Sequence, residues 1–193
     1  YDGEINETQI DDMFWLINDE AYIIQASNES GISATYPLGI KTKTDGINSI
    51  LIDALENVPN AMNVYLHDNE LGIYHDLRTG SYDIFLIKGD YLNRFEITFG
   101  TQDDVLGIDD YTINPIDVLY SNTIKKIVVV NPNQIDVKMI GVYNMLGQSV
   151  YNINTVEPQK YSEYNIKILS TGTYVVKLQT TAGFSITKKF IVD

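Results

Sequence analysis

Cysteine is absent from this 193-residue chain, which excludes disulfides, thiolate nucleophiles and thiolate metal ligands. Histidine is scarce, with only His67 and His75 present. No apolar run approaches the roughly 18 residues needed to span a bilayer, so membrane insertion is not expected. The motifs G-x-S-x-G, G-x-G-x-x-G and H-E-x-x-H are also missing. These absences remove the commonest enzyme and cofactor patterns, and we interpret the chain as non-enzymatic.

Basic residues are scarce in the first part of the chain. Residues 1–119 carry 5 Lys and Arg against 22 Asp and Glu, a net charge of -17. Residues 120–193 carry 8 Lys against 4 acids, a net charge of +4, within a total of -13. A strongly negative field repels phosphate backbones and anionic headgroups, so nucleic acid is not an expected partner.

Short apolar segments rich in Ile, Val, Tyr and Phe recur along the first half, bounded by Asn, Asp, Gly or Ser. This pattern is typical of antiparallel sheets. Five consecutive apolar residues within Ile10–Ile17 fit either a helix or a buried strand. Strands are expected at Tyr22–Gln25, Ser49–Ile52, Val64–His67, Gly72–His75, Tyr82–Ile87 and Arg94–Phe99.

The segment GTQDDVLGIDDYTINP, residues Gly100–Pro115, has the composition of a linker between two β-rich blocks. We predict an all-β chain with an acidic β-sandwich passenger domain at residues 1–100 and a linker at 101–119. A small immunoglobulin-like sandwich is expected at 120–193. Its expected strands are Ile124–Val130, Ile135–Tyr143, Gln148–Ile153, Tyr164–Ile168, Tyr174–Gln179 and Phe184–Val192.

Several lysines fall within the strand patterns of the second block. Apolar and polar residues alternate in two of its strands, which places Lys167 and Lys177 on a solvent-facing side. In the last strand Lys188 interrupts the apolar parity, which predicts either a bulge or an edge position near Lys188 and Lys189. We expect Lys177, Lys188 and Lys189 on or near the exposed side of the terminal hairpin.

Two stretches of the second block carry a resemblance to a known family: VYNMLGQSVYN at Val142–Asn152 and LSTGTYVVKLQTTAGFSITKKFIVD at Leu169–Asp193. They resemble the C-terminal sorting domain of type IX secretion substrates from Bacteroidota. Where that family usually opens with a P-N-P-like element, this chain has Ser121-Asn122. The residues that match the family motif are Asn144, Leu146, Gly147, Gln148, Gly172, Tyr174, Val176, Lys177, Gly183, Lys188, Lys189, Phe190, Ile191 and Val192.

The resemblance implies that the second block is an address and catalyses nothing. The implied partners are the type IX secretion translocon, a gingipain-like sortase that removes the tail, and an anionic lipopolysaccharide to which the passenger is coupled. The implied localisation is secreted or cell surface, reached through the periplasm and outer membrane. Because the sequence begins at Tyr1 without a signal peptide, we interpret it as a processed product or a C-terminal fragment.

The first block has a second resemblance, through VYLHDNELGIYHDLRTGSYDIFLIKGDYLNRFEITF at Val64–Phe99. This segment is similar to the last sandwich domain of large secreted Flavobacteria proteins, which implies context and no activity. Fourteen tyrosines and one tryptophan leave open an adhesin or carbohydrate-binding role for residues 1–100. A structural spacer for an upstream region is the other alternative.

Metal sites are not favoured by the sequence. A loop at Asn69–Gly72 would pair His67 with Tyr74 and His75 with Leu66, placing the two imidazoles on opposite faces of the sheet. No cofactor is predicted, although calcium stays open because carboxylates and amides are its usual ligands. Solvated acidic loops are the favoured reading of the two candidate clusters, Asp103, Asp104, Asp109 and Asp110, and Asp68, Asn69 and Glu70.

Overall fold

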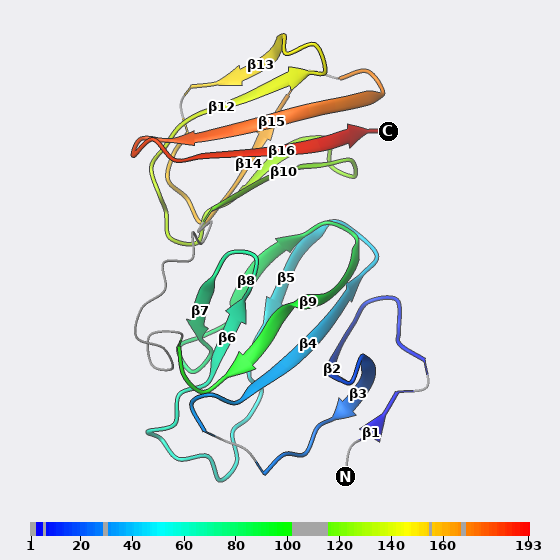
Figure 1. Ribbon diagram of the computed structural model, residues 1–193, viewed down its shortest axis with the longest axis vertical. Coiled ribbons are helices and arrows are strands. Elements are labelled where there is room, and N and C mark those ends of the chain that lie inside the picture. Colours follow the sequence, from blue (N-terminus) through cyan, green and yellow to red (C-terminus); the bar gives the residue numbers. More distant parts are fainter. Residues whose placement is uncertain (1–2, 6, 29–30, 102–115, 155, 167–168) are drawn as a thin grey trace. The chain divides into compact units, whose positions relative to one another are not determined.

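A computed structural model shows an all-β chain in two compact units, Tyr1–Ile113 and Asn114–Asp193 (Figure 1). It describes all residues except 1–2, 6, 29–30, 102–115, 155 and 167–168. All strand pairs in the described residues are antiparallel. Within that part of the chain, no helix has the length and apolarity that crossing a bilayer requires. The predicted fold class is confirmed.

The first unit pairs a large sheet with a small one. The large sheet has the order β1-β3-β2-β4-β9-β6-β7, and the small sheet pairs β5 with β8. Side chains of β8 pack towards the large sheet, where the Tyr82 hydroxyl donates a hydrogen bond to Asp68. The strands are β1 Gly3–Glu4, β2 Asp12–Ile17, β3 Glu20–Ile24, β4 Thr35–Thr42, β5 Gly46–Ile50, β6 Tyr65–Asp68, β7 Ile73–Asp76, β8 Tyr82–Leu86 and β9 Gly89–Thr98.

The open question at residues Ile10–Ile17 resolves as the strand β2. Of its apolar run only Phe14 is buried, while Met13 is 51% exposed. The apolar run therefore belongs to a strand with one buried face and one partly exposed face, and not to a fully buried strand. The sequence analysis missed β4 altogether, although β4 lies between β2 and β9 in the centre of the large sheet.

The second unit is a seven-stranded sandwich with an immunoglobulin-like division of strands. One sheet has the order β10-β11-β14 and the other β13-β12-β15-β16. The chain crosses between the sheets after β11, β13 and β14, which interleaves them in the Greek-key manner. The strands are β10 Asp117–Ser121, β11 Lys126–Val130, β12 Val137–Asn144, β13 Ser149–Ile153, β14 Tyr161–Asn165, β15 Gly172–Thr180 and β16 Ser185–Val192.

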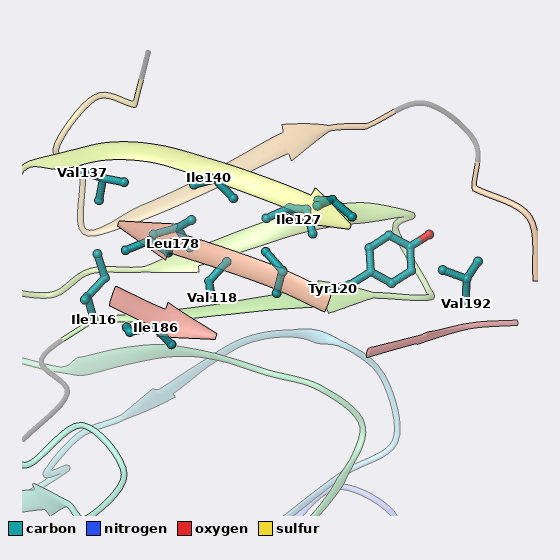
Figure 2. Packing of buried hydrophobic residues seen from close by; sticks show 12 residues of the cluster. Ile116, Val118, Tyr120, Ile127, Val137, Ile140, Leu178, Ile186 and Val192 are labelled. Atoms are coloured by element: carbon teal, nitrogen blue, oxygen red, sulfur yellow. The ribbon is translucent and has the colours of Figure 1, made fainter. Parts of the chain in front are cut away.

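The core of the second unit lies between its two sheets. Figure 2 shows side chains from both sheets meeting there, among them Val118 of β10, Ile140 of β12 and Leu178 of β15, all 0% exposed. Ile186 and Val192 of the last strand belong to the same cluster. The last strand therefore contributes to the core and is not an appended tail.

The segment interpreted as a linker, residues 101–119, overlaps this sandwich at its end. Asp117–Leu119 belong to β10, and Ile116 is 0% exposed within the core cluster. The strand expected at Tyr164–Ile168 lies three residues earlier, at Tyr161–Asn165. Lys167 lies outside the described residues.

Candidate functional site

The terminal hairpin, β15 and β16, forms one side of the four-stranded sheet. Its register runs without a shift from Gly172 opposite Val192 to Gln179 opposite Ser185. Because the pairing contains no bulge and β16 ends the sheet order, the edge alternative is the one the structure adopts. Lys177 is exposed, between the fully buried Val176 and Leu178, as the alternating pattern predicted.

Lys188 lies on the edge strand and is exposed, but it also makes an ion pair. It shares the parity of the buried Ile186 and Val192, so its stem starts from the inner face of β16. Its ammonium Nζ lies 2.7 Å from Oδ1 and 2.9 Å from Oδ2 of Asp117, on β10 of the other sheet. The Asp117 side chain is 10% exposed and that of Lys188 46%. Because β16 is an edge strand, the long Lys188 side chain can extend past the side of its own sheet to the other sheet. The ion pair therefore links β10, the first strand of the sandwich, to β16, the last.

Asn122 makes hydrogen bonds to the backbone at the C-terminal end of β16. Its amide Nδ2 donates to the Ile191 carbonyl at 2.8 Å, and its Oδ1 accepts from the Asp193 N–H at 3.1 Å. Lys125 adds a bond from Nζ to the Asp193 carbonyl at 3.3 Å. Sequence analysis missed Asn122 and Asp117, because contacts between residues about 70 positions apart leave no local signal.

The turn between β12 and β13 has a conformation held by Asn144. The Asn144 Oδ1 accepts the N–H groups of Leu146 and Gln148, both at 3.0 Å, and its Nδ2 donates to Gln148 Oε1 at 2.8 Å. Backbone bonds join Asn144 to Gln148 and Gly147. Gly147 has φ +77°, a left-handed conformation that glycine adopts without steric cost. Asn, Gly and Gln at these three positions therefore specify the shape of the turn.

The motif residues do not converge on one patch. Val176 and Val192 are in the core, and Tyr174 stacks on Phe190 with ring centres 5.7 Å apart. Gly172 opens β15, and Gly183 has φ +90° in the β15–β16 turn. Most of the motif therefore encodes the fold. The motif residues that are exposed are Leu146, Gly147, Gln148, Lys177, Gly183, Lys188, Lys189 and Ile191.

The first unit contains a buried charged cluster around Asp68. The Asp68 carboxylate is 1% exposed and accepts two bonds from Arg94, at 3.0 Å and 2.9 Å. It also accepts the Tyr82 hydroxyl at 3.0 Å and the N–H groups of Glu70 and Leu71. Burial lowers the pKa of Arg94, but the hydrogen bonds to Asp68 and the charges of Asp68 and Glu70 together outweigh burial, so the pKa is raised. Burial, and then the Asp68 charge, raise the pKa of Tyr82.

This cluster bears on the calcium alternative at Asp68, Asn69 and Glu70. Both carboxylate oxygens of Asp68 are engaged with Arg94, and Glu70 also binds the guanidinium at 2.7 Å. The loop is therefore organised by the Arg94 guanidinium, which occupies the carboxylate oxygens that a metal ion would need. Across the described ranges, no group of three or more His, Asp or Glu side chains could hold a metal ion. Asp103, Asp104, Asp109 and Asp110 lie outside the described residues.

The two histidines adopt the predicted register. His67 pairs with Tyr74 and His75 with Leu66, so their side chains lie on opposite faces of the sheet. His67 Nδ1 lies 2.8 Å from Glu96 Oε1, and its ring stacks on Tyr74 with centres 4.0 Å apart. His75 Nε2 lies 3.1 Å from the Gly80 carbonyl.

Comparison with known families assigns both units. Residues 1–99 match the family described as a domain of unknown function (DUF8693), which covers half of the chain. Residues 118–193 match the secretion system C-terminal sorting domain, which confirms the type IX resemblance. No curated protein matches the chain. A sorting domain of this kind acts with the type IX secretion machinery and marks a secreted or cell-surface protein. The chain therefore belongs to the DUF8693 family through residues 1–99 and ends in a type IX secretion sorting domain at residues 118–193.

Proposed function

We propose that residues 118–193 act as a folded address that carries residues 1–100 across the outer membrane as its passenger. The observation that carries this proposal is the closed sandwich of the second unit. Its last strand contributes Ile186 and Val192 to the core and is fastened to β10 through Lys188 and Asn122. An address with its own core presents one fixed surface, which a translocon can recognise by shape.

A finer part of the proposal concerns the fate of the tail. We propose that a gingipain-like sortase removes residues 118–193 after translocation and couples the passenger to an anionic lipopolysaccharide. The support is the sorting-domain match alone.

The experiment expresses the full chain behind a Sec signal in a bacterium that has the type IX system. We expect the passenger in the medium or on the cell surface, and a matched chain lacking residues 118–193 in the periplasm. The mass of the exported passenger reports tail removal, and a ladder on a denaturing gel reports lipopolysaccharide. Periplasmic retention of the full chain, with an established substrate exported normally, would refute the address.

We propose that residues 1–100 are an exported passenger domain without catalytic activity. The aromatic contacts give no specific support to a glycan platform: the Trp15 and Tyr36 rings meet at 82°, and the Tyr36 and Phe99 rings at 62°. Edge-to-face packing uses ring faces that a sugar would need. Calorimetry of the full chain with a polysaccharide panel, with and without calcium, would reveal binding as heat and so overturn this assignment.

A further inference from the structure

The turn at Asn144–Gln148 displays two apolar side chains that its own shape does not require. The bonds that hold it use the Asn144 amide, the Gln148 amide and backbone groups. Met145 and Leu146 contribute only backbone to this arrangement, and their side chains are 64% and 83% exposed. Polar residues at these two positions would satisfy the same hydrogen bonds.

Leu146 is the most exposed large hydrophobic side chain in the described part of the chain. Most other aliphatic residues of the second unit lie in or against the core between the sheets, and the next most exposed one, Ile191, is 55% exposed. Met145 and Leu146 form a small exposed apolar patch, which we call the knob. The polar Asn144 and Gln148 flank it and hold the turn, and a patch of this kind is typical of a recognition site. The turn joins β12 to β13 at the end of the sheet opposite the β15–β16 turn (Figure 1).

We propose that Met145 and Leu146 insert into an apolar recess of the type IX secretion machinery, making this turn the point at which the address is read. The inference rests on the proposed function, because the sorting domain must contact that machinery. This contact is apolar, so it is distinct from any electrostatic role of the lysines on β15 and β16.

The size of the knob favours this occupant over a second copy of the chain. Two side chains and their recess bury a few hundred Å² at most, whereas a stable interface needs about 1,200–2,000 Å². A small apolar contact suits a transient encounter, because an exported protein must be released after it has been recognised. Burying one leucine changes affinity by roughly tenfold to a hundredfold.

The test compares initial export rates of the full chain and three variants behind the same Sec signal. Leu146→Ser is expected to slow export by about tenfold or more, with the precursor accumulating in the periplasm. Leu146→Met keeps an apolar side chain and is expected to export at the rate of the unmodified chain. Phe184→Ser is the matched control, because Phe184 is an exposed hydrophobic residue in the opposite turn of the same sheet. Thermal melting of each purified variant checks that the fold is unchanged.

The outcomes separate this inference from the proposed function. If the unmodified chain is exported and Leu146→Ser matches it, the knob is refuted while the address stands. Equal slowing of Leu146→Ser and Phe184→Ser would also refute the knob, since the effect would not depend on position. If the unmodified chain is retained, the address fails and the knob fails with it. A concentration-dependent dimer that Leu146→Ser abolishes, measured by light scattering, would assign the turn to self-association instead.

Discussion

Replacing Asp68 with asparagine should destabilise the first unit by about 3 kcal/mol. Asp68→Asn keeps the side-chain volume but removes the charge that faces the buried Arg94 guanidinium. Breaking a buried ion pair in this way generally costs about 3–5 kcal/mol, because the remaining charge is left without compensation. Glu70 still contacts Arg94 at 2.7 Å, and its side chain is 53% exposed, so we expect the lower end of that range. A domain of this size has about 5–15 kcal/mol in total.

Urea unfolding measured by tryptophan fluorescence isolates this effect. Trp15 is the sole tryptophan of the chain and lies on β2, so its emission follows the first unit alone. With a urea slope of about 1.5–2 kcal/mol per molar, the midpoint should fall by about 1.5–2 M. Asp90→Asn is the matched control, because Asp90 is 61% exposed and its carboxylate lies 3.9 Å from Lys41 Nζ. Its cost should stay within about 0.5 kcal/mol. Equal midpoints for the two variants would refute the reasoning.

Three further predictions concern packing, the C-terminal end of β16 and pH. Gly39→Ala should cost about 1–3 kcal/mol in the same tryptophan assay, because a Cβ there would overlap the buried Phe14 ring; a loss under about 0.5 kcal/mol would contradict this. Asn122→Ala should speed hydrogen exchange at the end of β16, seen by mass spectrometry of the C-terminal peptide, and unchanged exchange would argue against the Asn122 contacts. The Lys126 bond lowers the pKa of Glu163, so its stabilisation is present above the usual glutamate pKa and is lost as pH falls through the folded value. Melting temperatures of the unmodified chain and Glu163→Gln should therefore differ at pH 7 and converge as the pH falls below the folded pKa of Glu163, and a constant difference would refute the linkage.

The hairpin of the first unit could be predicted in detail because its determinants are local. Alternating side chains and a short loop at residues 69–72 fixed the pairing of His67 with Tyr74, which the structure adopts. The same approach missed β4, because Pro37 and Gly39 usually interrupt strands. Pro37 is tolerated since β2 pairs with β4 only from Leu38 onward, so no partner needs the missing N–H on that side. Gly39 leaves room for the Phe14 ring of β2.

In the second unit the sequence predicted strands and missed the contacts that assemble them. Asp117 lay in a segment interpreted as a linker, because an acidic, proline-containing stretch masks the short apolar strand that follows it. Its partner Lys188 is 71 positions away, so the ion pair has no local pattern. The turn at Asn144 is the opposite case: every group that shapes it lies within five residues.

The adjacent lysines on β16 differ in function because they point to opposite faces of an edge strand. Lys189 faces solvent opposite Val175, and Lys188 faces the other sheet, where Asp117 neutralises it. An inward lysine at an edge opposes pairing with a foreign strand, because a new neighbour would bury a charge. Asn122 occupies the backbone groups of Ile191 and Asp193 that such a neighbour would use. Lys188 and Lys189 therefore lie where the exposed edge of an all-β unit needs protection from aggregation.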